Sequence, residues 1–511
     1  MDLWMKQARP ETRRHHIHRH YSSLGSSTTL SISTLVLWKA SQVLSLGYIL
    51  HLEKAAAIFA HSDKLYRPGP LYIKESFTYA IPSRHSLLFS SIDFDIIIVV
   101  MGEFEFAPTV LVSVREFDPN NDREGVEAVE RICEVGPNGK LSLFTDLHGD
   151  PICRVRNSPT FLMLIAEIGQ ETVGMIRGCI KTVTCGKKLH RQGKSNTETE
   201  PKQVPIYTKL AYILGLRVSP HHRRMGIGFK LVQSMEEWFR DNGAEYAYMA
   251  TEKDNVASVK LFTDKCGYSK FRTPCILANP VFAHHVRISN KVTIIELSPN
   301  DAELLYRSKL ATTEFFPRDV DSVLGNRLSL GTFLAVPRVG SYQPDTWSGS
   351  ARFLLDPPPS WAILSVWNCK DVFTLEVKGV SRVKKTLAKT TRVLDRVFPW
   401  LRLPSVPNFF EPFGFLFLYG LGGEGPQAQQ MLRALCGFAH NLAKDRGCEV
   451  VATEVSSQEP LRCAIPHWKM LSCEEDLWCI KRLGEDYSDG SLGDWTKSPP
   501  GFSIFVDPRE V

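Results

Sequence analysis

One stretch of the sequence, LRVSPHHRRMGIGFKLVQSMEEWF at positions 216–239, constrains the fold more than any other. It ends an almost wholly apolar run, residues 209–218, which predicts a strand buried on both faces near the middle of a sheet. A proline, four basic or imidazole side chains and two glycines then precede apolar residues at helical spacing, and Gly243 ends that pattern. A strand, a glycine corner and a helix in this order predict an α/β fold.

The patterns on either side extend this unit into a larger sheet. Asn255 is a plausible N-cap for a short helix, and the polar residues 184–205 predict a long loop. The expected elements, in chain order, are strand 111–117, helix 123–136, hairpin strands 161–169 and 172–183, strand 209–218, the helix after the corner, strand 246–254 and helix 255–267. Their mixture predicts an α/β fold with a mixed (α+β) sheet.

The second half of the chain repeats this order. An apolar strand at 413–419 meets a glycine corner and a helix, and GCEVVATEV then parallels the earlier GAEYAYMATEK. This likeness predicts an internal duplication with a diverged second copy; the alternative is two unrelated strand–helix–strand units. We expect a poorly ordered or atypical N-terminal extension at 1–110, a first domain at 111–290, a second at 291–483 and a tail at 484–511, irregular over 484–500.

Composition excludes several classes of protein. The 511 residues carry a net charge of only +6, which does not indicate wholesale nucleic-acid binding. The 12 cysteines include no Cys-x-x-Cys pair, so we expect free thiols, no metal site and a reducing compartment, the nucleus or cytoplasm. Residues 1–50 are basic and serine-rich, which is typical of a poorly ordered extension or, alternatively, an organelle transit peptide. Lys39 interrupts the apolar run there, so no membrane span is expected.

Three phosphate-binding designs use glycines before a helix. A P-loop needs lysine after its last glycine, where Phe229 stands, and a dinucleotide fingerprint needs a third glycine at Leu231. The third design is the Arg/Gln-x-x-Gly-x-Gly/Ala loop of the GNAT acetyltransferases, which Arg223, Gly226 and Gly228 satisfy. Glycines bring backbone N–H groups close to a pyrophosphate, and the helix dipole and arginines add positive charge. The expected binding residues are Arg223, Arg224, Met225, Gly226, Ile227 and Gly228. The alternative is a corner that only allows close helix–strand packing.

With these motifs in place, residues 111–285 resemble the GNAT superfamily. VREFDPNNDREGVEAVERICEVG and LRVSPHHRRMGIGFKLVQSMEEWF more narrowly resemble the plant Hookless-type N-acetyltransferases, over about four fifths of the chain. Such proteins usually start near Ser113, so Met101 is a candidate start. The resemblance implies acetyl-CoA as donor and a developmental or hormone-response role. It also implies that the backbone of Leu216 and Val218 pairs with the pantetheine arm and that Asn255 contacts the cofactor, unless it is only an N-cap.

The catalytic pair is not assigned by the sequence. Many GNAT relatives use a carboxylate on the central strand as base, but residues 209–218 contain no acid. Many use a tyrosine in the last helix as acid, where this chain has Phe262. Glu252, Glu167 and Tyr212 are weak candidates, because each also suits a structural role.

The second glycine corner has Glu424 and lacks arginine, so we expect the second domain not to bind CoA and instead to shape the acceptor groove. The basic run 378–396 indicates either a solvated helix face or a surface for an acidic or nucleic-acid-associated partner.

The leading hypothesis is therefore an enzyme, an acetyl-CoA-dependent N-acetyltransferase acting on a protein amine, with a histone lysine and a chromatin-associated acceptor as one option. No sequence-specific nucleic-acid contact and no membrane partner are expected. The rival hypothesis is a non-catalytic GNAT-fold regulator that works through protein contacts. A small-molecule acetyltransferase is a third alternative.

Overall fold

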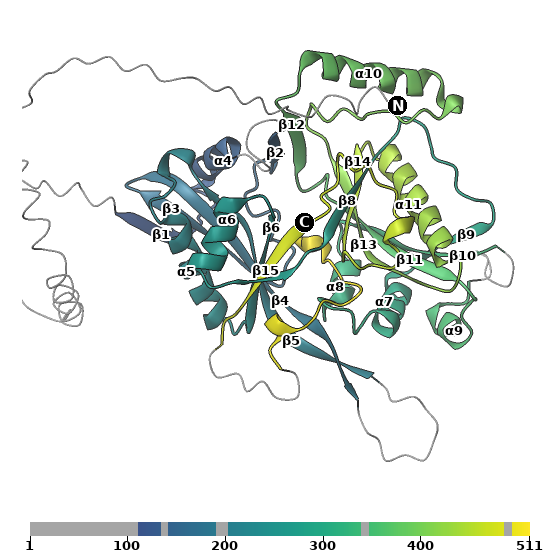
Figure 1. The fold of residues 1–511 in the computed structure, drawn as a ribbon, viewed down its shortest axis with the longest axis horizontal. Helices are drawn as coiled ribbons and strands as arrows, with labels where there is room; N and C mark the ends of the chain where they lie inside the picture. Colours follow the sequence, from purple (N-terminus) through teal and green to yellow (C-terminus); the bar gives the residue numbers. More distant parts are fainter. Residues whose placement is uncertain (1–110, 134–141, 191–202, 339–346, 485–492) are drawn as a thin grey trace, which may run out of the picture. The chain divides into compact units, whose positions relative to one another are not determined.

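The computed structural model describes residues 111–133, 142–190, 203–338, 347–484 and 493–511, which belong to one compact unit (Figure 1). The expected N-terminal extension at 1–110, with its transit-peptide alternative and the candidate start at Met101, lies outside the described residues.

A seven-stranded mixed sheet contains the predicted central strand. Its order is β1 (Val112–Glu116), β3 (Thr160–Ile168), β4 (Glu171–His190), β5 (Gln203–Val218), β6 (Tyr246–Glu252), β15 (Asp476–Arg482), β7 (Ser269–Arg272). β5 runs parallel to β6 and the other neighbours are antiparallel, which confirms the predicted mixed sheet. Helix α5 (Ile227–Asp241) covers one face through Leu231, Met235 and Phe239, and α4 (Arg123–Ile132) packs on the opposite face.

The hairpin of β4 and β5 is longer than predicted. The expected loop at 184–205 is wrong at both ends, because β4 continues to His190 and β5 begins at Gln203. The backbone pairing of the two strands extends through these polar residues, with Lys188 opposite Pro205. Backbone pairing does not require the apolar alternation from which strands are predicted. The middle of the expected loop, 191–202, lies outside the described residues.

A second, six-stranded sheet repeats the first. Its order is β9 (Val292–Leu297), β10 (Ser329–Pro337), β11 (Trp361–Asn368), β13 (Phe415–Glu424), β14 (Val450–Val455), β8 (Cys275–Pro280). β13 and β14 are the parallel pair and α11 (Ala428–Asp445) joins them, as α5 joins β5 and β6. The tandem arrangement predicted from the repeat is confirmed. Smaller helices α7 (Pro299–Lys309), α8 (Val320–Leu324) and α9 (Ser350–Leu355) complete this half.

The two sheets exchange strands. β8 precedes residue 290 in sequence but pairs with β14, and β15 follows the whole second sheet in sequence but pairs with β6 (Figure 1). A further two-stranded sheet joins β2 (Ser142–Asp146) to β12 (Thr374–Lys378). The expected boundary at 290 stays a prediction, and each sheet is completed by a strand from beyond it. Each half therefore depends on a strand from the other half to pair with a strand of its own sheet.

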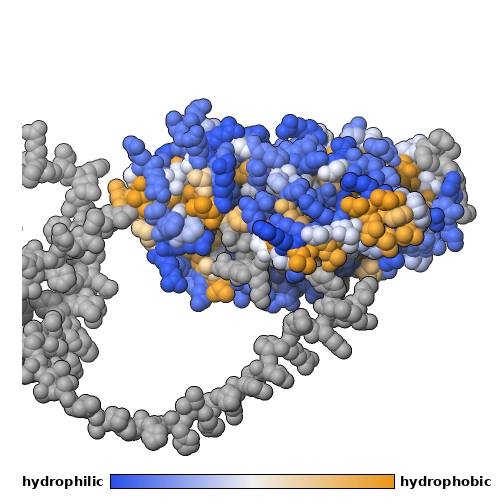
Figure 2. All heavy atoms as spheres, turned by 90° about the horizontal axis from the view of Figure 1, so that it is seen from above, coloured by the Kyte–Doolittle hydropathy of each residue, from blue (hydrophilic) through white to orange (hydrophobic). Residues whose placement is uncertain are grey.

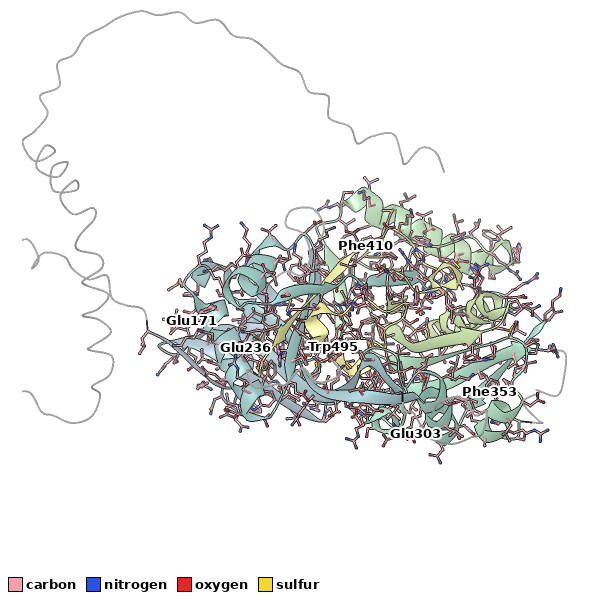
Figure 3. All side chains as sticks on the ribbon, turned by 60° about the horizontal axis from the view of Figure 1, so that its bottom comes forward. Glu171, Glu236, Glu303, Phe353, Phe410 and Trp495 are labelled. Carbon is pink, nitrogen blue, oxygen red and sulfur yellow. The ribbon has the colours of Figure 1, made fainter. Side chains whose placement is uncertain are left out.

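The C-terminal residues fill the space that the two sheets share. Trp495, in the short helix η8 (Trp495–Lys497), is 2% exposed and contacts the rings of Tyr246, Phe271 and Phe315 (Figure 3). Its indole Nε1 donates to Glu314 Oε1 at 2.7 Å. From residue 493 on, the expected tail is irregular in structure, but Trp495 and residues 505–510 within it are buried; aperiodic segments give no sequence signal of burial.

The predicted basic run forms helix α10 (Arg382–Val397). Its lysines and arginines are accompanied by exposed apolar side chains, and an apolar patch stands out on the face viewed in Figure 2. The exposed apolar residues of this region are Val383, Leu387, Val393, Leu394, Val397, Phe398, Trp400, Leu401 and Leu403. Only Ala388 and Asp395 of α10 are buried, so the predicted solvated helix face is confirmed, and exposed apolar side chains accompany its charges.

All 12 cysteines are free thiols. Among the described residues, no group of histidine, cysteine or carboxylate side chains has the arrangement of a metal site, and no helix has the length and apolarity to cross a membrane.

Candidate functional site

The site begins where β5 and β6 separate. Their parallel pairing runs from Leu210 opposite Tyr246 to Ile213 opposite Met249 and ends there. A bulge follows at Gly215, which has φ of +64°, and beyond it Val218 pairs only with Gly174 of β4. Within the described strands, the edge of Leu216 and Val218 that faces β6 therefore has no strand partner. The two residues predicted to pair with pantetheine stand at a fork that an extended ligand can enter.

The glycine corner closes the open end of this fork. Gly226 has φ of +81° and Arg224 has φ of +67°, so the chain turns through left-handed conformations just before α5. Ile227 is 2% exposed and fixes the start of the helix, while residues 223–226 are exposed. The first N–H groups of a helix have no partner within it, which leaves them available for an anion.

Close packing supports the corner from behind. A Cβ at Gly228 would stand 3.4 Å from Leu261 and 3.7 Å from Val218, so α5 approaches both β5 and the helix that follows β6. Arg223 Nε donates to the carbonyl of Val218 at 3.3 Å, which ties the corner to the end of the strand. Met225 is 43% exposed, and its predicted contact with the cofactor stays a prediction.

Asn255 lies at the end of the neighbouring strand. Its Oδ1 accepts from the Ser258 N–H at 3.2 Å and caps α6 (Val256–Lys260), and its own N–H donates to the Glu252 carbonyl at 2.9 Å. The side chain is exposed, so the predicted N-cap is confirmed and a contact to a ligand in the fork stays a prediction.

Three carboxyl groups gather at the end of β6. Glu252 lies opposite Asp476 in the β6–β15 ladder, and both face the core shared by the two sheets, as do their strand neighbours Ala250 and Trp478. Glu454 of β14 faces the same space and accepts from Trp478 Nε1 at 3.0 Å. The cluster thus unites strands of both sheets.

Burial raises the pKa of each of these carboxyls. For Glu252, Asp254 adds to the effect of burial. For Asp476 the pKa reaches about 6, through burial and the nearby charge of Glu252. For Glu454 the pKa lies well above its usual range, through burial and the charge of Asp476. Carboxyl groups tuned towards neutral pH can accept a proton from an ammonium.

Comparison with known proteins identifies the family. The model of the acetyltransferase (GNAT) family matches residues 133–268. The "Probable N-acetyltransferase HLS1" of Arabidopsis thaliana is 68% identical over 402 residues, which cover 78% of this chain and 99% of the relative. Its "HLS1-like" counterpart in the same plant is 67% identical over 411 residues, with 79% and 100% covered. The "Acetyl transferase GW6a" of Oryza sativa subsp. japonica is 38% identical over 443 residues, with 78% and 98% covered.

The chain belongs to the GNAT acetyltransferase family. It is an N-acetyltransferase of the Hookless type, as the resemblance predicted, and the GNAT family uses acetyl-CoA as co-substrate.

Two of the predicted catalytic candidates have structural partners in this GNAT fold. Glu167 is held by Arg115, whose Nε donates to Glu167 Oε2 at 3.0 Å. Tyr212 stacks on Tyr248 with ring centroids 4.5 Å apart, and burial keeps the pKa of its phenol well above the usual value. The Tyr212 phenol is therefore neutral at physiological pH, and Glu167 is engaged in an ion pair.

Phe262, at the position where many GNAT relatives carry tyrosine, is 1% exposed and packs edge-on against Tyr268 at 5.1 Å. It is a core residue in this chain.

The sequence analysis missed Asp476 and Glu454. Glu454 could have been found, because it ends the ATE of VATEV as Glu252 ends the ATE of MATEK in the internal repeat. Asp476 gave no such signal, since its strand joins the first sheet from the far end of the second half.

The second glycine corner is filled by the chain itself. A Cβ at Gly425 would collide with the carbonyl of Pro359, and the N–H of Gln427, at the start of α11, donates to Ser360 Oγ at 3.0 Å. Glu424 pairs with Lys309 at 2.9 Å. These contacts support the prediction that this half does not bind CoA.

Proposed function

We propose that this N-acetyltransferase transfers the acetyl group of acetyl-CoA to an amine of a protein. The observation that carries the proposal is the open fork between β5 and β6, which leads directly into the corner at Gly226 and the start of α5. Pantetheine would extend along Leu216 and Val218, and the pyrophosphate would meet residues 223–228. Asn255 lies on the other arm of the fork.

Glu252 is the proposed general base, assisted by Asp476. The amine must lose a proton to become a nucleophile, and a lysine amine has a pKa near 10.4. Glu252 accepts that proton, the amine nitrogen bonds to the acetyl carbon, and the carbon–sulfur bond breaks. The leaving thiolate takes a proton from water, because the raised pKa of the Tyr212 phenol makes it a weaker acid than a thiol. Orientation of the amine in the fork contributes the rest of the rate enhancement.

The second half of the chain shapes the acceptor side of the site, because β15 and Glu454 both belong to it. The Hookless-type relationship supports a developmental or hormone-response role in a plant, with the nucleus or cytoplasm as the compartment. A histone lysine in a chromatin-associated acceptor is one candidate substrate. The rival, a non-catalytic regulator, is favoured by one observation: residues 209–218 of β5 carry no acid.

Calorimetric titration of acetyl-CoA into the full chain tests the proposal. We expect micromolar binding that is lost in Gly226→Asp, which adds a carboxylate to the corner, and in Arg224→Glu. Arg433→Glu, an equal charge change on the exposed surface of α11, is the control and should bind normally. Absence of binding by the folded wild-type chain would mean that the fold serves protein contacts, and the enzymatic proposal would fail.

A further inference from the structure

Three arginines converge beside the fork, on the face of the sheet opposite α5. Arg177 extends from β4 and is 0% exposed, Arg217 extends from the end of β5, and Arg154 lies in the turn that precedes β3. Burial is the largest cause that lowers the pKa of Arg154; the charges of Arg177 and Arg217 lower it further, while Tyr212 and Glu130 act in the opposite direction. Three like charges thus share one small volume.

One carboxylate accompanies these three charges. Glu130 of α4 lies 3.2 Å from Arg177 Nη2 and 3.5 Å from Arg217 Nε. Arg177 Nε also donates to the carbonyl of Pro151 at 2.6 Å, and Arg154 stacks over the ring of Phe373. Among the described residues this leaves an excess of positive charge beside the fork.

Two donors of the cluster, Arg154 Nε and Arg177 Nη1, have no hydrogen-bond acceptor in the described part of the chain. Arg217 Nε makes no hydrogen bond either and has only the ion pair with Glu130 at 3.5 Å. Leaving a buried polar group without a partner is costly, and the cost is greater for a charged group. The unused donors indicate that an acceptor of hydrogen bonds belongs there.

The cluster lies beside the reacting groups. Arg217 stands between the predicted pantetheine residues Leu216 and Val218. Arg177 Nη1 lies over the bulge, because a Cβ added at Gly215 would collide with it. Burial and then the charge of Glu510 raise the pKa of the Tyr212 phenol; the charge of Arg154 opposes this, and those of Glu454 and Asp476 add to it. Tyr212 therefore lies within electrostatic range of both Arg154 and the carboxyl cluster.

We propose that the acceptor carries a carboxylate close to its amine, and that Arg154, Arg177 and Arg217 bind this carboxylate while the amine faces Glu252 and Asp476. Guanidinium groups match a carboxylate in both charge and shape. The inference rests on the acetyl-CoA-dependent transfer step of the proposed function and specifies the chemistry of the acceptor. An acceptor whose amine is flanked by basic side chains would instead bring positive charge close to Arg217, which would repel it. Two sources fit the same chemistry: a free amino acid, or a protein segment with an acidic residue beside the acetylated amine.

Matched acceptor pairs test the inference with the full chain. One pair is an α-amino acid and its α-amide; the other is a peptide with one lysine flanked by glutamate and the same peptide with glutamine. Thiol release from acetyl-CoA and the acetylated product give kcat/KM for each. The variants are Arg154→Gln, Arg217→Gln and the charge-retaining Arg217→Lys. Arg156→Gln is the control, because Arg156 is exposed and pairs with Asp150 at 2.5 Å.

We expect the carboxylate member of one pair to react with kcat/KM higher by about tenfold or more, as loss of one charge-assisted hydrogen bond implies. In Arg154→Gln and Arg217→Gln the preference should disappear because KM for the carboxylate member rises. It should persist in the control Arg156→Gln and return in part in Arg217→Lys. Acetyl-CoA affinity should not change, which shows that the variants fold. The pair that responds identifies the source of the carboxylate.

Equal use of both members, a preference for the amide or the uncharged peptide, or a preference that survives both glutamine variants would overturn the inference. So would binding of acetyl-CoA without acetylation of any member of either pair. A chain that binds no acetyl-CoA would overturn the proposed function, and this inference with it.

Discussion

Asp476 lies directly opposite Glu252 in the antiparallel ladder of β15 and β6. Residues 224 positions apart in sequence are thereby brought to one face at the end of the fork. Directly opposed side chains in such a ladder are near neighbours, and two carboxyls there disfavour each other's ionisation. The strand exchange between the sheets therefore creates this pair of carboxyls, in which burial and the charge of Glu252 raise the pKa of Asp476 to about 6.

Glu252→Gln should reduce kcat by about 100-fold or more, the usual effect of removing a general base. Acetyl-CoA affinity should stay unchanged, because the amide keeps the size of the side chain and the corner is untouched. The measurement is kcat as a function of pH beside a calorimetric titration. Glu475→Gln is the control, since this neighbouring side chain is 61% exposed and pairs with Lys253. A variant that retains wild-type kcat would exclude Glu252 as the base.

Asp476→Asn should change how stability depends on pH. The folded pKa of Asp476 is raised to about 6, through burial first, whereas an unfolded aspartate titrates near 3.9. The folded state therefore binds more protons between these values, and its free energy of unfolding falls as pH rises through that range. The variant should lose this decrease and be more stable at pH 7 by an amount on the order of 2 kcal/mol.

Urea unfolding at pH 4 and pH 7 measures the effect on both chains. Asp371→Asn, at an exposed position, is the control and should follow the wild type at both values. An unchanged difference between the two pH values in Asp476→Asn would show that Asp476 titrates normally.

The central elements of the fold were predictable because their signals are local. Neighbouring residues alone predict the strand at 209–218, the corner with glycines at 226 and 228, and the apolar stripe of α5. In the structure these three elements follow one another directly. The repeat likewise predicted β13, α11 and β14.

Long-range pairing was not predictable in the same way. A pattern of alternating residues predicts that β8 and β15 are strands but not which sheet receives them. The arginine cluster depends on this packing too, since Arg154, Arg177 and Arg217 come from a turn and two strands with no common motif. The proposed acceptor side of the site therefore required the structure, whereas the predicted cofactor side did not.

Gly215→Ala should destabilise the protein by about 1–3 kcal/mol and lower kcat/KM, because an L-residue is strained at φ of +64° and its Cβ would displace Arg177. Gly169→Ala separates the two effects: its φ is +63°, and a Cβ there would meet nothing within 4 Å. We expect the control to show only the strain, about 1 kcal/mol, with normal kcat/KM. Equal losses in the two variants would show that contact with Arg177 contributes nothing at the bulge.

Asp507→Asn tests whether the C-terminal segment holds the two halves together. Asp507 is 0% exposed, its Oδ2 accepts from Arg509 Nη2 at 2.7 Å, and Lys181 of β4 lies 3.6 Å away. Burial tends to raise its pKa, but the charges of Arg509 and Lys181 outweigh this and hold the pKa below the usual value. Neutralising it leaves buried positive charge under-compensated, so we expect a loss of about 3 kcal/mol at pH 7.

The sign of the pH dependence follows from that lowered pKa. The stability that Asp507 contributes is fully present above the unfolded pKa near 3.9 and is lost as pH falls below it, because the unfolded state then binds the additional proton. The wild type should thus lose more stability than Asp507→Asn between pH 5 and pH 3, as measured by urea unfolding. Arg509 also pairs with Asp319, and Lys181 with Glu510, so both cations keep one partner in the variant and the fold should survive. If both chains lost equal stability on acidification, the carboxylate of Asp507 would not be the group that joins the C-terminal segment to β4.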